Sequence, residues 1–146
     1  MIETCACHRI RMAARAVTRA YDEALRPIGL RATQASVLAA VAAEGAMSIT
    51  ALARFIGMDR STLTRNLAPL EKEGLLSLGS EGWRRSRTLA ITAKGRSRLE
   101  KAMPLWEEAQ RSLKREIGAR QWDEVQQSLD HLIRGSAPPR SHASEA

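Results

Sequence analysis

Apolar residues recur at helical spacing over most of the chain. Between about residues 7 and 28 they fall three and four positions apart, which predicts an amphipathic helix that closes at Pro27 and Gly29. A second helix is predicted from an N-cap at Thr33 to a stop near Gly45. The chain therefore begins with two helices of different length.

Two shorter helices follow, joined by a tight turn. Ser48 is placed to cap the first, which ends at Gly57, and Asp59 is placed to cap the second, which ends at Gly74. The inner face of the second helix is marked by Leu63, Leu67 and Leu70. Two short helices joined by about three residues that include a glycine form the helix-turn-helix pattern. We therefore expect the helix that follows Asp59 to be the recognition helix, which contacts DNA.

The periodicity then changes. Short apolar runs at residues 75–78 and 88–91 flank a turn rich in Gly and Ser, which predicts a β-hairpin. Thr92 is placed to cap a long helix, and Gly118 separates it from a last one. Residues 135–146 have no periodicity and are expected to form a disordered tail. The terminal helices have apolar faces without a partner in the chain, which predicts a dimerisation bundle made from two copies.

The charged residues are distributed unevenly along the chain. The 146-residue chain is 44% apolar and 27% charged, as expected for a globular domain with its own core. Residues 51–98 carry ten Lys and Arg against four Asp and Glu, whereas residues 99–146 carry seven against eight. The positive excess therefore coincides with the helix-turn-helix and the hairpin, which indicates a polyanionic partner.

The sequence argues against two broad classes of protein. No apolar run approaches the about 20 residues that span a bilayer, and the N-terminus has no signal-peptide pattern, so we expect a cytoplasmic protein without membrane contact. No Gly-rich phosphate loop, nucleophile elbow or metal-ligand pair at helical spacing is present, so we expect neither an enzyme nor a bound cofactor.

The stretch from Ser48 to Gly95 resembles the MarR family of transcriptional regulators. Typical of that family are the Asp-Arg-Ser-Thr-Leu-Thr-Arg run from Asp59, the Leu-Glu-Lys-Glu-Gly-Leu run at residues 70–75, and the closing Ile-Thr-Ala-Lys-Gly at residues 91–95. The resemblance implies a mainly α fold with a small β-hairpin wing. It further implies a winged helix-turn-helix joined to a helical dimerisation bundle that the N- and C-terminal helices form.

The resemblance also implies a domain layout and a function. One domain is expected at residues 1–134, with the DNA-binding part at about 31–95 and the dimerisation helices at about 8–30 and 96–134. The implied function is that of a homodimer that binds a pseudo-palindromic operator in double-stranded DNA. Such a regulator is usually a repressor that a small-molecule effector releases. Two alternatives stay open: a redox-sensing regulator, and an architectural DNA-binding protein without an effector.

The expected recognition helix offers side chains suited to binding DNA. Arginine forks bind guanine edges or phosphates, and hydroxyl groups bind bases or phosphates. The expected major-groove contacts are Arg60, Ser61, Thr62, Thr64 and Arg65. The expected minor-groove contacts of the wing are Arg84, Arg85 and Arg87. By analogy with the family, Thr33 and Gln34 are expected to contact phosphate. Trp83 stands where the family commonly has an acid that pairs with a wing arginine.

The Cys5-Ala-Cys7-His8 run allows three interpretations. Two thiols can form a disulfide or be oxidised by peroxide, which would make them a redox centre. Two thiolates and one imidazole can also contribute to a zinc site, although zinc usually takes four ligands. The third interpretation is that they are small packing residues at the start of the first helix.

Arginines repeat every fourth residue along the first helix, at Arg11, Arg15 and Arg19. The family's usual effector pocket lies between the dimerisation bundle and the DNA-binding part, so Arg11 or Arg15 could hold the carboxylate of an effector there. Tyr21 is a further candidate for this pocket. The alternative is a solvated basic stripe, or ion pairs with the partner subunit.

Overall fold

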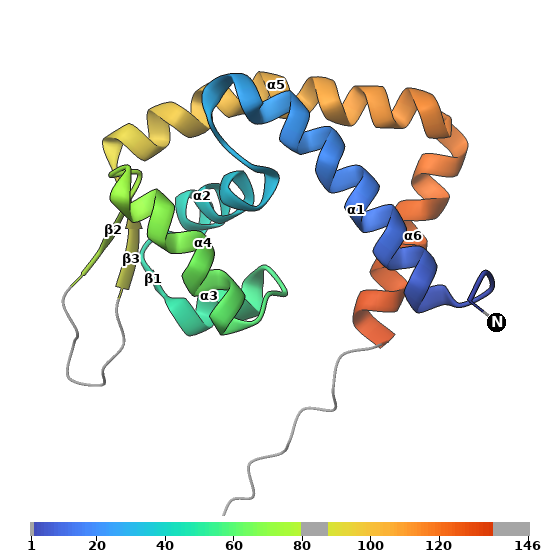
Figure 1. Ribbon diagram of the computed structural model, residues 1–146, viewed down its shortest axis with the longest axis horizontal. Helices are drawn as coiled ribbons and strands as arrows, with labels where there is room; N and C mark the ends of the chain where they lie inside the picture. Colours follow the sequence, from blue (N-terminus) through green and yellow to red (C-terminus); the bar gives the residue numbers. More distant parts are fainter. Residues whose placement is uncertain (1, 80–87, 136–146) are drawn as a thin grey trace, which may run out of the picture. The chain divides into compact units, whose positions relative to one another are not determined.

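The computed structural model describes residues 2–79 and 88–135. It divides into two units, Met1–Ala109 and Gln110–Ala146. The helices are α1 (Ala6–Leu25), the 3-10 helix η1 (Arg26–Ile28), α2 (Ala32–Glu44), α3 (Ile49–Phe55), α4 (Arg60–Lys72), α5 (Ala93–Ile117) and α6 (Ala119–Gly135). The strands are β1 (Met47–Ser48), β2 (Leu76–Leu78) and β3 (Thr88–Ile91) (Figure 1). The expected mainly α fold with a small antiparallel sheet is confirmed. No helix in the described ranges is long and apolar enough to cross a membrane.

The sheet places β3 between two antiparallel neighbours, in the order β1-β3-β2. The register pairs Leu76 with Ile91 across β2 and β3, and Ser48 with Thr88 across β1 and β3. The predicted hairpin strands are therefore confirmed. The two-residue β1 was not predicted, because so short a strand shows no alternating pattern in the sequence.

The core of the first unit joins three helices to this sheet. Helices α2, α3 and α4 contact one another, α2 packs against β3, and α4 packs against β2 (Figure 1). Leu38, Leu52, Leu63 and Leu89 come from four of these elements and are fully buried. Burying each such side chain contributes about 1.5–3 kcal/mol. This core sets the orientation of α4 against the rest of the unit.

Side-chain caps set where helices begin. The Ser48 hydroxyl accepts a hydrogen bond from the Ala51 N–H at 3.1 Å, and the Thr92 hydroxyl accepts one from the Gly95 N–H at 3.0 Å. Each bond satisfies one of the N–H groups that have no partner inside the helix. Both caps agree with the sequence prediction, as does the cap of α4 by Asp59.

The predicted N-cap of α2 is wrong. The helix begins at Ala32, one residue before Thr33, and Arg31 is its N-cap. The Ala32 N–H donates to a carboxylate oxygen of Asp22 at 2.7 Å, and the Arg31 N–H donates to the Gln34 side-chain oxygen at 2.9 Å. Because an acid from α1 and an amide from α2 accept these hydrogen bonds, no hydroxyl cap is needed and the helix starts earlier.

The terminal helices expose apolar side chains. In α1, Ile10 is 41% exposed and Val17 is 37% exposed. Helix α6, which is described along its whole length, has no buried residue. Its exposed apolar side chains, all at least 39% accessible, are Val125, Leu129, Leu132 and Ile133. Each of these two helices therefore leaves part of its apolar face uncovered in the single chain.

Candidate nucleic-acid interface

Asp59 fixes the start of α4. Its carboxylate accepts hydrogen bonds from the Ser61 hydroxyl and from the Thr62 N–H, the latter at 2.8 Å. These hydrogen bonds from Ser61 and Thr62 hold the pKa of Asp59 well below its ordinary value. An ionised carboxylate is also favourable at a helix N-terminus, where the unpaired N–H groups carry positive partial charge. The first turn of α4 is therefore held in place by a charged cap.

The predicted major-groove side chains lie in the first two turns of α4, and four of the five are exposed. Leu63, Leu67 and Leu70 of this helix are at most 3% exposed. Thr62 is half-buried, and the other four residues are exposed: Arg60, Ser61, Thr64 and Arg65. The structure thus gathers these five residues at one end of α4. That they contact DNA stays a prediction.

Two of these side chains are oriented by their neighbours. An Arg65 guanidinium nitrogen donates to the Thr62 hydroxyl at 3.3 Å, and the Thr64 hydroxyl donates to the Arg60 carbonyl at 2.8 Å. The guanidinium of Arg65 keeps further N–H donors for a partner outside the chain, because it has five. The arrangement is suited to binding an acceptor such as a base edge or a phosphate.

A side-chain hydrogen bond ties α2 to α4. The Thr33 hydroxyl donates to the Asn66 side-chain oxygen at 3.3 Å, and the Asn66 amide donates to the Thr62 carbonyl at 3.0 Å. Asn66 was not singled out in the sequence, because nothing in its spacing marks it. Thr33 and Gln34 are both engaged within the chain, Gln34 in the cap of α2. Their predicted contact with phosphate stays a prediction.

The wing is described only at its base. The Gly79 N–H donates to the Thr88 carbonyl at 2.8 Å, so β2 and β3 are hydrogen-bonded at the last described residues of each side. The predicted minor-groove residues Arg84, Arg85 and Arg87, together with Trp83, lie outside the described residues.

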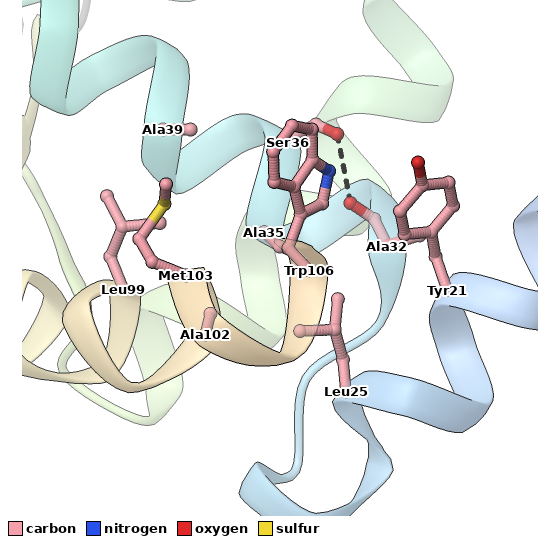
Figure 2. A pocket seen from close by; sticks show the side chains of 10 residues that line it. All are labelled: Tyr21, Leu25, Ala32, Ala35, Ser36, Ala39, Leu99, Ala102, Met103 and Trp106. Carbon is pink, nitrogen blue, oxygen red and sulfur yellow. Dashed lines mark hydrogen bonds between the residues drawn. The ribbon is translucent and has the colours of Figure 1, made fainter. Parts of the chain in front are cut away.

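A cavity of about 360 Å³ lies in the first unit between α1, α2 and α5 (Figure 2). All of its lining residues are uncharged: Tyr21, Leu25, Ala32, Ala35, Ser36, Ala39, Leu99, Ala102, Met103 and Trp106. The rings of Tyr21 and Trp106 are stacked at one side, with centroids 6.3 Å apart and planes 19° apart. Of the residues predicted for an effector pocket, Tyr21 lines this cavity, whereas Arg11 and Arg15 do not.

The two cysteines lie at the start of α1. Cys5 is the N-cap residue of α1, and Cys7 and His8 follow in its first turn. Both thiols are free and exposed, so they do not pack against other parts of the described chain. Within residues 2–79 and 88–135, no three His, Cys, Asp or Glu side chains are grouped to hold a metal ion.

We expect Asp59→Ala to lower the melting temperature by a few degrees at neutral pH. Because the pKa of Asp59 is lower in the folded chain, its carboxylate stabilises the fold above the ordinary aspartate value of about 4, and this contribution is lost as the pH falls further. The difference between wild type and variant should therefore shrink from pH 7 to pH 3 in circular-dichroism melts. Asp59→Asn, which can still cap the helix, is the control. An equal difference at both pH values would contradict the role of the charge.

Comparisons with known proteins agree with this geometry. A model of the MarR family matches residues 28–86. The M. tuberculosis transcriptional regulator MosR is 37% identical, with a TM-score of 0.82 over 93% of this chain and 98% of that chain. Its complex with DNA is 39% identical, with a TM-score of 0.81 over 90% and 96%.

A more distant relative extends the comparison to a ligand-bound structure. The transcriptional repressor CouR, solved with p-coumaroyl-CoA, is 25% identical, with a TM-score of 0.80 over 91% of this chain and 94% of that chain. No curated protein matches the chain. The proteins it is similar to are transcriptional regulators, and they span nearly its whole described length. The helix-turn-helix, the paired wing strands and these relatives together show that the chain belongs to the MarR family of winged-helix, DNA-binding transcriptional regulators.

Proposed function

We propose that the chain is a repressor that binds a pseudo-palindromic operator as a homodimer and is released by a small ligand. The observation that carries this proposal is the N-terminal end of α4, where Asp59 caps the helix and arginines and hydroxyls face outward. It lies within residues 51–98, whose ten Lys and Arg against four Asp and Glu give most of the net positive charge of the chain. Solved complexes of MosR and CouR with DNA support the assignment.

The homodimer is supported by the uncovered apolar faces of α1 and α6. We assign dimerisation to residues about 8–30 and 96–134, and DNA binding to residues about 31–95. A two-fold axis between the copies would present two α4 helices to successive major grooves, about 10 bp apart. A pseudo-palindromic operator follows from that symmetry.

We propose that side chains of α4 determine the preference for the operator sequence, whereas those of the wing raise the affinity for any DNA. Arg60, Ser61, Thr62, Thr64 and Arg65 of α4 would enter the major groove. Arg84, Arg85 and Arg87 of the wing would enter the minor groove, where negative potential attracts them without base-specific bonds. Thr33 and Gln34 would approach phosphate.

Gel-shift titrations of Arg65→Ala and Arg85→Ala test this division. Arg65→Ala should weaken operator binding about 5- to 150-fold and relax the preference for operator over random DNA, because a bidentate base contact contributes about 1–3 kcal/mol of discrimination. Arg85→Ala should weaken binding to both DNAs alike and reduce the salt slope by about 1.

Arg140→Ala is the matched control, because Arg140 lies outside the residues assigned to DNA binding and to dimerisation. It should bind as the wild type does. Unchanged affinity in both Arg65→Ala and Arg85→Ala would exclude these DNA contacts. Equal wild-type affinity for operator and random DNA would favour the architectural alternative.

A redox response is the second candidate, favoured by two free and exposed thiols two residues apart at the start of α1. Peroxide would oxidise the two thiols to a disulfide, within one chain or between two, and would itself be reduced to water. We expect peroxide to weaken operator binding and dithiothreitol to restore it. A variant with Cys5→Ser and Cys7→Ser should not respond. The same response in this variant would exclude the cysteines as the sensor.

A further inference from the structure

The cavity between α1, α2 and α5 has a chemical character of its own. Its volume of about 360 Å³ lies at the lower end of the range of ligand sites, about 300–1,000 Å³. Aliphatic side chains form most of the lining, and the stacked rings of Tyr21 and Trp106 stand on one side (Figure 2). Such a space fits a flat molecule of about two fused rings, whose faces and edges can pack against apolar and aromatic groups.

We propose that this cavity binds an uncharged planar aromatic molecule and discriminates against anions. The proposal deepens the proposed release by a small ligand and rests on it for its regulatory meaning. The lining carries no charge and three polar side-chain groups: the Tyr21 hydroxyl, the indole N–H of Trp106, and the Ser36 hydroxyl, which donates to the Ala32 carbonyl at 3.0 Å and can still accept a hydrogen bond. These groups suit an amide, a hydroxyl or a carbonyl on the edge of a ring.

None of the lining residues is charged, and two charged side chains close to the lining are engaged within the chain. Asp22 lies at the α1–α2 end of the lining, where its carboxylate accepts a hydrogen bond from the N–H of Ala32. Arg98 adjoins the lining residue Leu99, but its guanidinium donates to the Ile28 carbonyl at 2.8 Å and pairs with Glu73 at 3.7 Å. A carboxylate in the cavity would therefore lose water without gaining a cation from the lining, and it would lie near the carboxylate of Asp22.

The pKa of Tyr21 also indicates that the cavity disfavours negative charge. Burial raises the pKa of its hydroxyl above the ordinary value, because the charged form loses water there. A site that disfavours the phenolate of one of its own side chains also disfavours a negatively charged ligand.

The cavity is linked to the recognition helix by a direct contact. Ala32 and Ser36 of α2 line it, and Thr33 between them donates a hydrogen bond to Asn66 of α4. Asn66 in turn donates to the carbonyl of Thr62, in the first turn of α4. A ligand that displaces the start of α2 would shift Thr33 against Asn66 and change the position of the reading end of α4. Such a ligand releases DNA only as far as it binds the displaced state more tightly.

Equilibrium dialysis of the full chain with naphthalene-2-carboxamide and naphthalene-2-carboxylate tests the proposal. The two probes share a ring system and differ in charge. The amide should bind at least about tenfold more tightly than the carboxylate, because the anion has no partner in the lining. Equal or tighter binding of the carboxylate would overturn the proposal. So would the absence of binding by either probe, as expected if a second copy of the chain fills the cavity.

Ala39→Phe and Ala43→Phe locate the binding site. Both alanines are exposed on α2, but only Ala39 lines the cavity. Ala39→Phe should abolish amide binding, whereas Ala43→Phe should leave it unchanged. Wild-type binding by Ala39→Phe would place the amide elsewhere and overturn the proposal. A parallel gel shift distinguishes the ligand preference of the cavity from the proposed release of DNA. Binding of the amide without release of operator DNA would support the ligand preference and contradict the proposed release.

Discussion

Replacing Gly95 by alanine is expected to destabilise the fold by about 3 kcal/mol, the upper end of overpacking effects. A Cβ atom at this position would lie 2.1 Å from the Leu75 carbonyl oxygen and 2.8 Å from the Ile91 Cγ1 atom. The Leu75 backbone cannot easily give way, because its N–H donates to the Leu70 carbonyl at 2.8 Å and its carbonyl accepts from the Thr92 N–H at 3.1 Å. The added methyl group must therefore separate the start of α5 from Leu75, in the segment that joins α4 to β2.

Urea and thermal unfolding followed by circular dichroism measure this effect. For a chain of this size, about 3 kcal/mol corresponds to a fall in Tm on the order of 10 °C. Gly135→Ala is the control, because a Cβ atom there would meet nothing within 4 Å. That variant should stay within about 0.5 kcal/mol of the wild type. If both variants unfolded at the same urea concentration, the close approach at Gly95 would not limit stability.

Placing lysines on the apolar face of α6 is expected to turn the proposed dimer into monomers. Leu129 is 39% exposed and Leu132 is 47% exposed in the single chain, so a partner can still cover them. Each fully buried leucine contributes about 1.5–3 kcal/mol, and a dimer would contain two copies of each. With Leu129→Lys and Leu132→Lys combined, the dimer should dissociate at least about 1,000-fold more readily, which corresponds to about 4 kcal/mol.

Sedimentation velocity at micromolar concentration measures this change directly. The matched control combines Gln127→Lys and His131→Lys, which add lysines to the opposite side of α6. The control should sediment as the wild type, and the leucine variant should sediment as a monomer with weaker operator binding. A leucine variant that remained dimeric would exclude this face of α6 from the interface.

Local signals made the helix-turn-helix predictable from the sequence. Ser48, Asp59 and Thr92 each carry an oxygen that can cap a helix, and each does so within three residues along the chain. The buried face of α4 was equally predictable, because its leucines repeat at helical spacing. Such features depend on neighbours in sequence and need no knowledge of the tertiary fold.

Features that depend on distant segments could not be predicted. The start of α2 depends on Asp22, ten positions before Ala32, so the choice of Thr33 as the cap followed a local preference that a tertiary contact overrode. Gly95 belongs to a motif that the sequence shows, but the reason for a glycine appears only where Leu75 approaches it.

The cavity was predictable only in part. Tyr21 was expected to line a pocket, but the expected arginines were not brought there, and the small residues of α2 had no visible role in the sequence. They line a hollow because α1 and α5 supply the other walls. Its uncharged lining changed the expected ligand from a carboxylate to a neutral molecule.

Ser48 belongs to two structures at once, since it pairs with Thr88 of β3 and caps α3 through the N–H of Ala51. Ser48 therefore links the base of the wing to the first turn of α3. We expect this link to limit how far the wing can adjust to a duplex, so that deformation of the DNA contributes to the fit. Operators with flexible pyrimidine–purine steps would then be bound at lower deformation energy, which would make base pairs that the protein never touches part of its specificity.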